Sequence, residues 1–202
     1  MNRMKTQNIL IAGVGGQGTL LASRVLGNLF LNMGYDVKIS EVHGMAQRGG
    51  SVVTHVKYGE RVYSPLVETG CADILLAFEK LEAIRWIHYL REGGMAVVNT
   101  QEIDPMPVIL GTQQYPSDLD ELLLKLCPNS VIIDALNIAK DLGNIRVVNT
   151  VLMGALACYL DIDTTEWEKA IKATVPPKTI DINLQAFYSG YNACRSQSNA
   201  PF

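Results

Sequence analysis

Residues 8–19 read NILIAGVGGQGT, and this stretch decides the fold. Its apolar run ILIA predicts a buried strand, and residues 19–26 carry apolar side chains at helical spacing. Gly13, Gly15 and Gly18 stand between the two in the pattern G-x-G-x-x-G. In such a strand–turn–helix unit the first glycine allows a sharp turn, the second allows close approach, and the third allows helix and strand to pack tightly. The stretch therefore predicts the start of a Rossmann-like domain.

The glycine turn has two interpretations. A helix that begins here presents free N–H groups and the positive end of its dipole, which favours an anion or a cofactor phosphate. Alternatively, the glycines serve only the turn and the packing. Gly16 leaves the loop almost without side chains, and Gln17 is a polar residue that we expect to point toward a ligand or a partner subunit.

The composition is that of a globular chain with little charge. Of 202 residues, 48% are hydrophobic and 18% are charged, and this length is sufficient for one domain with its own core. A formal net charge of −3 without a basic cluster argues against a nucleic-acid partner. The first residues are polar, and the most apolar late stretch, residues 147–160, is shorter than a membrane span. We therefore expect a cytoplasmic protein without membrane contact.

The cysteines and histidines do not predict a metal site. Iron–sulfur clusters and structural zinc usually need closely spaced thiolates, and the chain has no C-x-x-C. No H-E-x-x-H or short histidine pair occurs either. We interpret the cysteines as ordinary thiols and expect no metal in this chain; the residues concerned are Cys71, Cys127, Cys158 and Cys194, with His43, His55 and His88.

A second strand is predicted over residues 35–42, where apolar and polar residues alternate after Gly34 ends the first helix. Glu41 lies at the end of this strand, about 20 residues beyond Gly18, where dinucleotide-binding proteins hold the ribose hydroxyls. A free-standing NAD(P)- or flavin-binding protein is therefore one alternative. The other is a solvated carboxylate at a strand end.

Directly after this strand, residues 43–51 read HGMAQRGGS and form a second glycine-rich stretch. The carboxyl ends of parallel strands face the ligand crevice, so we expect both glycine-rich loops to meet at one edge of the sheet. Arg48 can hold a phosphate or carboxylate through two hydrogen bonds, whereas an ordinary exposed turn is the alternative. The residues expected to face a ligand or a partner are Gly13, Gly15, Gly16, Gln17, Gly18, His43, Gly44, Gln47, Arg48, Gly49, Gly50 and Ser51.

A β-hairpin is predicted after the second strand. Residues 51–58 alternate again, Gly59 and Glu60 form a turn, and residues 61–63 are expected to return as the second strand. A plain dinucleotide-binding domain would place a helix here, so the insertion weakens the dehydrogenase interpretation. His55 is interpreted as a strand-face residue and not as a catalyst.

The rest of the chain alternates between strands and helices and then becomes helical. We predict an α/β fold with a Rossmann-like, mainly parallel sheet, an inserted β-hairpin and a helical C-terminal segment. Within a single domain, 1–202, the α/β part spans residues 8–146, helices packed on it span 147–195, and a mobile tail spans 196–202. The predicted strands are 71–78, 95–99, 130–134 and a possible short one at 108–110; the predicted helices before residue 146 are 79–90, 119–126 and 135–142.

Three stretches together resemble the gamma-type subunits of 2-oxoacid:ferredoxin oxidoreductases. They are residues 11–18, residues 41–51 and residues 149–155, and the resemblance extends over residues 8–195. The glycine pattern alone is a weak signal, but its combination with HGMAQRGGS at this distance is fairly specific. Within the family, the indolepyruvate type is the most similar.

The resemblance implies a part of an enzyme that is not active alone. The family's complexes decarboxylate a 2-oxoacid oxidatively to an acyl-CoA, use coenzyme A as co-substrate and pass electrons to ferredoxin. Thiamine diphosphate and the iron–sulfur clusters belong to a large partner subunit, so this chain would carry no cofactor. The two loops would then cover the active-site mouth, where Gln17, Gln47 and Arg48 would donate to the substrate carboxylate, coenzyme A phosphates or partner backbone. A purely structural scaffold is a further alternative.

Overall fold

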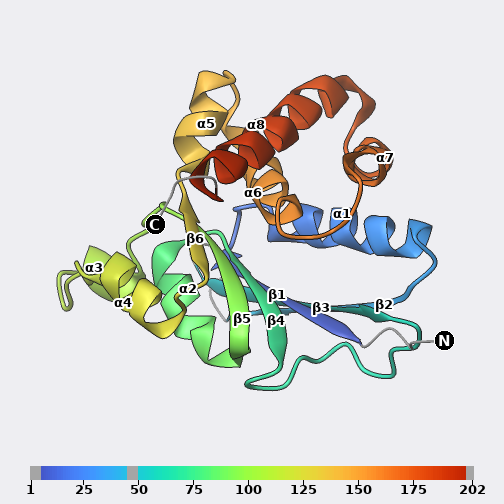
Figure 1. The fold of residues 1–202 in the computed structure, drawn as a ribbon. Helices are drawn as coiled ribbons and strands as arrows, with labels where there is room; N and C mark the ends of the chain where they lie inside the picture. Colours follow the sequence, from blue (N-terminus) through green and yellow to red (C-terminus); the bar gives the residue numbers. More distant parts are fainter. Residues whose placement is uncertain (1–5, 45–49, 199–202) are drawn as a thin grey trace.

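The computed structural model describes residues 6–44 and 50–198, which form a six-stranded sheet with helices on both faces (Figure 1). The strand order is β2-β3-β1-β4-β5-β6. β1 (Gln7–Val14) pairs in parallel with β4 (Ala72–Ala77), which continues in parallel to β5 (Leu90–Asn99) and β6 (Ser130–Ile133). The predicted α/β class with a mainly parallel sheet is therefore confirmed.

β3 (Ser51–Gly59) is the strand that runs against the others. It pairs antiparallel with β1 on one side and with β2 (Asp36–His43) on the other. β1 and β2 consequently point the same way and are connected by α1 (Thr19–Asn32), but they are not neighbours. β2 and β3 thus form an antiparallel pair, which differs from the predicted hairpin of residues 51–58 and 61–63.

The predicted return strand at residues 61–63 is wrong. Both edges of β3 are already paired, so no edge is free for another strand. Instead, the Val62 N–H donates to Asp36 Oδ2 at 2.8 Å, and the Val67 N–H donates to His55 Nδ1 at 3.1 Å. The chain after β3 therefore crosses one face of the sheet before it enters β4.

The region between β4 and β6 differs from the prediction in two places. α2 (Lys80–Trp86) is shorter than expected and ends in a 3₁₀ turn, Ile87–Tyr89, because β5 already begins at Leu90. Residues 108–110 form no strand; Pro105 at a helix N-cap starts the short helix α3 (Met106–Ile109) instead. α4 (Leu119–Leu126) and α5 (Ala135–Asp141) follow the predicted bounds closely.

Three helices complete the chain: α6 (Val148–Ala157), α7 (Thr164–Thr174) and α8 (Ile180–Ser198). α8 includes residues 196–198, which were expected in the tail, and the remaining tail residues 199–202 lie outside the described residues. α6 and α8 cross at two glycines: a Cβ on Gly154 would lie 2.0 Å from the Phe187 carbonyl oxygen, and one on Gly190 would lie 1.9 Å from the Val151 carbonyl oxygen.

The central strands are buried on both faces. Ile9, Ile11 and Leu76 pack against α1, α6, α7 and α8, which Figure 1 shows on one side of the sheet. Leu10 and Leu75 alternate with them and pack toward α2 and α4 on the other side. This continuous burial explains the uninterrupted apolar runs of β1 and β4. Over the described ranges, no helix combines the length and apolarity needed to cross a membrane.

Candidate functional site

The two glycine-rich loops meet at the carboxyl ends of β1 and β2. The Gly15 N–H donates to the Gly50 carbonyl at 2.9 Å, and the Gly44 N–H donates to the Ser51 carbonyl at the same distance. The first bond continues the antiparallel register that pairs Val14 with Ser51, and the second continues the register that pairs His43 with Val52. We call this rim, formed by residues 15–18, 43, 44, 50 and 51, the glycine edge. Gln47, Arg48 and Gly49, which were also predicted to face a ligand or a partner, lie outside the described residues.

The third family-like stretch lies against the first. Asn149, in the first turn of α6, places its side-chain amide over Gly18, where Nδ2 is 3.5 Å from the Gly18 carbonyl oxygen. A Cβ on Gly18 would lie 2.8 Å from that nitrogen, and the positive φ of 87° also favours glycine. Gly18 is therefore required for packing. All three stretches that carried the family resemblance touch the same edge.

Gln17 holds the edge together from inside. Its Oε1 accepts from the Val14 N–H at 2.7 Å, and its Nε2 donates to the Phe78 carbonyl at 3.0 Å and to Gln101 Oε1 at 3.2 Å. Both amide hydrogens are thus used within the chain. The Gln17 side chain therefore bridges the carboxyl ends of β1 and β4 and also lines the cleft described below; that it faces a ligand or a partner stays a prediction.

A buried asparagine extends this bridge to β5. Asn99 Nδ2 donates to the same Phe78 carbonyl at 3.2 Å, and Asn99 Oδ1 accepts from the Ala135 N–H at 3.1 Å, where α5 begins. Sequence reasoning missed Asn99 and Gln101. The available signal was a polar residue that ends an apolar strand on the ligand side of a parallel sheet.

The arrangement does not fit a dinucleotide. In that class of site the acidic residue follows the strand next to β1, and the cofactor enters the crevice where the strand order reverses. Here β3 separates β2 from β1, and Gln17 bridges the carboxyl ends of β1 and β4. Glu41 is mostly buried: it accepts from Thr54 Oγ1 at 3.0 Å and pairs with His43 Nε2 at 2.7 Å. Glu41 is therefore neither a ribose ligand nor a solvated carboxylate.

A cleft of about 300 Å³ opens beside the first loop. Among its lining residues, Arg146 contributes a positive charge, and Gln17 and Gln101 contribute amides. The rest are glycines and apolar side chains from α5, the turn before α6 and the first residue of α6. Such a lining suits an anionic group attached to an apolar body. Arg146 was not predicted, because it stands in a short 3₁₀ helix, Ile145–Val147, without a recognisable motif. The cleft residues are Gly16, Gln17, Gly18, Gln101, Leu136, Ile145, Arg146 and Val148.

A buried carboxylate anchors the second loop. Ser51 donates its hydroxyl to Glu82, and Trp86 Nε1 donates to Glu82 Oε2 at 3.2 Å. Arg85 Nη1 pairs with the other Glu82 oxygen at 3.2 Å. A buried carboxylate is tolerated only with such donors, so this cluster fixes Ser51 on α2. The Ser51 hydroxyl is used internally, although its residue was predicted to face outward.

Glu79 is a second buried carboxylate at the same edge. Its Oε2 accepts from the Glu82 N–H at 2.8 Å, and its Oε1 accepts from the Ile103 N–H at 3.1 Å and from the Tyr115 hydroxyl. Burial, with the hydrogen bond to Glu79, raises the pKa of Tyr115 well above its usual range, so the phenol stays protonated. Glu79 therefore joins α2 to both ends of the segment that contains α3.

His55 has a structural role in the sheet. His55 lies in β3, and its Nδ1 accepts from the Val67 N–H at 3.1 Å. Burial lowers the pKa of His55, which favours the neutral ring that this bond needs. The prediction of a strand-face residue is confirmed. His43 is exposed on the glycine edge and pairs with Glu41.

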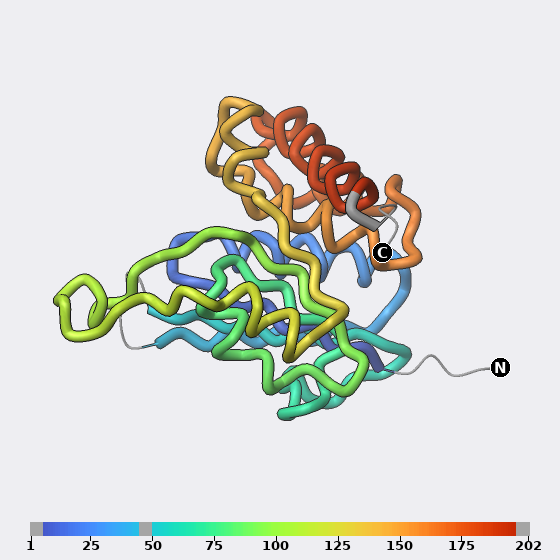
Figure 2. The backbone as a smooth tube through the Cα atoms, turned by 60° about the vertical axis from the view of Figure 1, so that its left-hand side comes forward, coloured from blue at the N-terminus to red at the C-terminus, as the bar shows by residue number. Residues whose placement is uncertain are grey.

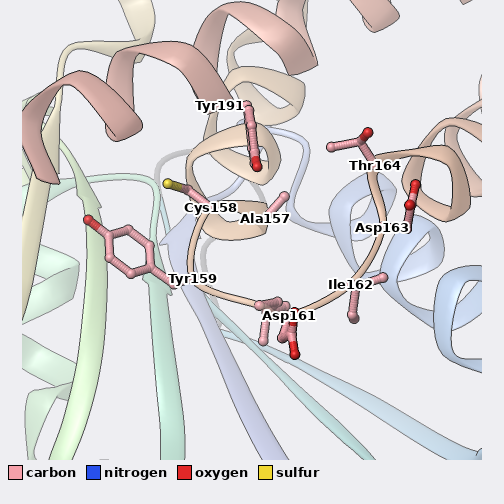
Figure 3. Close-up of a pocket in the computed structure, with 9 residues that line it drawn as sticks. Ala157, Cys158, Tyr159, Asp161, Ile162, Asp163, Thr164 and Tyr191 are labelled. Atoms are coloured by element: carbon pink, nitrogen blue, oxygen red, sulfur yellow. The ribbon is translucent and has the colours of Figure 1, made fainter. Parts of the chain in front are cut away.

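A wider pocket lies away from this edge. Figure 3 shows it around the loop between α6 and α7, with Tyr191 of α8 above it. Asp163 on its rim accepts from the Thr165 N–H at 2.8 Å and caps α7, and these hydrogen bonds lower the pKa of Asp163. The Asp163 carboxylate thus serves the helix start. α6 runs from the glycine edge at Asn149 to this pocket at Ala157, so the two features lie at opposite ends of one helix.

The described residues contain no group of three or more His, Cys, Asp or Glu side chains that could hold a metal ion. None of the four cysteines, all of which lie in the described residues, forms a disulfide; Cys127 and Cys194 are buried, Cys158 is half-buried and Cys71 is exposed. Among the described residues, the glycine edge and the adjoining cleft present backbone groups, the amides of Gln17 and Gln101, the His43 imidazole, the Ser51 hydroxyl and the Arg146 guanidinium. This chemistry suits a polar or anionic organic group, or another protein's backbone.

Comparison with known proteins identifies the class. The family model described as pyruvate ferredoxin/flavodoxin oxidoreductase matches residues 8–193, and the chain belongs to this family. The indolepyruvate oxidoreductase subunit IorB of Thermococcus kodakarensis is 43% identical over 199 residues, covering 95% of this chain and 98% of the relative. The subunit of the same name from Pyrococcus horikoshii is 40% identical over 202 residues, covering 97% and 100%. The resemblance stated from the sequence is therefore confirmed.

The fold also matches a solved structure. The gamma subunit of the keto/oxoacid ferredoxin oxidoreductase from Geobacter sulfurreducens superposes with a TM-score of 0.71 and covers 94% of this chain and 99% of its own. Its sequence identity is 23%, so this match supports the fold alone. The free-standing dinucleotide-binding alternative is not favoured by the family or by the site.

Proposed function

We propose that this chain is the small subunit of an indolepyruvate ferredoxin oxidoreductase, and that its glycine edge covers the active-site mouth of a large partner subunit. The observation that carries the proposal is the convergence of the three family-like stretches through the Gly15–Gly50 and Gly18–Asn149 contacts. The names of the relatives supply the substrate class, indolepyruvate.

In the proposed reaction a 2-oxoacid loses carbon dioxide, its acyl group passes to coenzyme A, and the released electrons reduce ferredoxin. Thiamine diphosphate and iron–sulfur clusters, held by the large subunit, would supply the carbanion chemistry and the electron transfer. The described residues of this chain fit neither group: its thiols are separated, and the crevice between β1 and β4 is bridged by Gln17.

In this proposal, the chain positions the bound ligand or partner and excludes water from the active site. The internal bonds of Gln17, Asn99 and Glu82 keep the edge in one shape, while exposed backbone at Gly16 lets a partner or a ligand approach closely. Arg146 in the cleft provides a charge for the substrate carboxylate or a coenzyme A phosphate. Covering the mouth also protects reactive intermediates from water.

The experiment is to reconstitute the complex with Arg48→Ala or Arg146→Ala in this chain. Arg61→Ala is the matched control, since Arg61 lies beyond the opposite end of β3, over the Tyr63 ring. A charge-assisted hydrogen bond contributes roughly 1.5–3 kcal/mol, so at least one test variant should raise the KM for coenzyme A or the 2-oxoacid about tenfold or more. Unchanged assembly and kinetics in both test variants would contradict the proposed role of the edge.

The dinucleotide alternative has its own test. Titration of the isolated chain with NADH and NADPH, followed by cofactor fluorescence, should show no saturable change. Saturable binding of NADH or NADPH at micromolar concentration would support the dinucleotide-binding alternative.

A further inference from the structure

A segment with a single charged residue, Asp104, projects from the sheet between β5 and α4. We call residues 103–115 the α3 arm. From Pro105 to Tyr115 it contains no charged residue. Figures 1 and 2 both show this segment extending beyond the body of the molecule. Met106, Ile109 and Leu110 on the arm are 57%, 64% and 68% exposed.

The arm has a fixed internal shape. Within it, the Leu110 N–H donates to the Met106 carbonyl at 2.9 Å. The Pro107 carbonyl accepts from the Thr112 N–H and hydroxyl, both at 2.9 Å. A segment that is already ordered loses less conformational entropy on binding than a mobile loop does. The exposed apolar side chains are therefore presented in a form ready to bind.

Hydrogen bonds to neighbouring buried carboxylates connect the base of the arm to the glycine edge. Glu79 Oε1 holds both the Ile103 N–H and the Tyr115 hydroxyl, so one buried carboxylate fixes both ends of the arm. The other Glu79 oxygen accepts from the N–H of Glu82, which holds Ser51 of the glycine edge. The arm also follows β5 at the same carboxyl side of the sheet. A partner that covers the glycine edge therefore meets the arm as well.

We infer that the α3 arm is an anchor that inserts Met106, Ile109 and Leu110 into an apolar groove of the large subunit. This inference rests on the proposed function. Interface cores are depleted of charge and enriched in methionine, and residues 105–115 of the arm carry no charge and include Met106. A stable interface buries about 800 Å² per partner, which three side chains cannot supply alone. The adjoining glycine edge supplies the remaining area, and this favours the partner of that edge over a second copy of this chain.

The test compares Leu110→Asp with Leu31→Asp in complexes reconstituted from the full chain and the large subunit. Leu31 is 56% exposed and lies near the end of α1, at the opposite edge of the sheet, so the control makes the same change on a similar surface. Loss of an anchor residue typically costs 2 kcal/mol or more, so Leu110→Asp should weaken the Kd for the large subunit by about 30-fold or more. Leu31→Asp should leave it within about threefold, and both variants should unfold at the wild-type temperature.

Each outcome has a distinct meaning. If the wild-type chain does not bind the large subunit, the proposed function fails, and the inference fails with it. If the wild type binds and Leu110→Asp binds as tightly as Leu31→Asp, the inference alone is overturned. It is also overturned if Leu110→Asp abolishes self-association of the small chain in sedimentation while leaving the mixed complex unchanged, because a second copy would then occupy the arm.

Discussion

Replacing Gly154 by alanine tests how tightly the C-terminal helices are fixed on the sheet. The added Cβ would lie 2.0 Å from the Phe187 carbonyl oxygen and 2.9 Å from the Tyr191 nitrogen. An ordinary contact needs at least 3.4 Å, so the first separation falls short by more than an ångström. Both obstacles are backbone atoms of α8, and no rotamer change can remove them. α6 and α8 would have to separate, and their packed residues, Val151 and Phe187 among them, would lose contact.

The expected magnitude follows from two opposing effects. Overpacking a core typically costs about 1–3 kcal/mol, and a backbone obstacle places this variant at the upper end or above it. Alanine regains about 1 kcal/mol through its higher helix propensity. We expect a net loss of about 2 kcal/mol in the free energy of unfolding. For a chain of this length, that corresponds to a decrease of about 4–8 °C in Tm.

Gly27→Ala is the matched control. Gly27 lies inside α1, and a Cβ there would approach Ile39 Cδ1 at 3.0 Å, the flexible end of a partly exposed side chain. This variant should be neutral or up to about 1 kcal/mol more stable than wild type. The assay is urea unfolding followed by circular dichroism, with the m value compared among the three proteins. If Gly154→Ala equals Gly27→Ala in stability, the close crossing of α6 and α8 is refuted.

Three further substitutions test the polar groups. Gln17→Leu leaves the Val14 N–H without its side-chain acceptor and should cost about 1–3 kcal/mol in urea unfolding, while Leu20→Gln on the exposed surface nearby should change little. Glu82→Gln keeps the size but removes the charge; a change in the Trp86 fluorescence with no loss of secondary structure would support its contact, and an unchanged spectrum would contradict it. Burial lowers the pKa of His55, so the His55 ring binds a proton more readily in the unfolded chain than in the folded one. The free energy of unfolding should therefore fall as the pH decreases below about 6.5. In His55→Gln, the difference in Tm between about pH 7.5 and 5.5 should be smaller than in the wild type.

Local pattern was enough to predict most elements, but not their neighbours. The strand–turn–helix order around Gly13 and Gly18 and the bounds of α4 follow from hydrophobic spacing and turn residues. The alternation in residues 51–58 predicts a strand, yet it does not say which strands lie on either side. β3 pairs with both β1 and β2, and because this long-range pairing occupies both edges of β3, residues 61–63 cannot pair with it.

In the candidate site, too, local features could be predicted from the sequence but long-range contacts could not. The meeting of the two loops was predictable, because the carboxyl ends of parallel strands share one edge. The direction of the Gln17 side chain was not, since it depends on the Phe78 carbonyl and Gln101, which stand 61 and 84 residues away. Glu79 and Glu82 were missed for a related reason: in the sequence they look like ordinary charges on a helix surface.

These contacts explain how a fold shaped for dinucleotides can serve as a docking subunit. At a nucleotide site, the polar groups at the strand ends must remain available to the ligand. Here Gln17, Asn99 and Glu82 use theirs to bind neighbouring strands and helices. Among the described residues of this region, glycine backbone, the His43 side chain, the cleft residue Arg146 and the apolar arm stay exposed. An edge whose polar side chains are bonded internally offers few hydrogen bonds to a small cofactor. Its exposed glycine backbone allows another protein's backbone to approach closely, which is the property that the proposed large subunit requires.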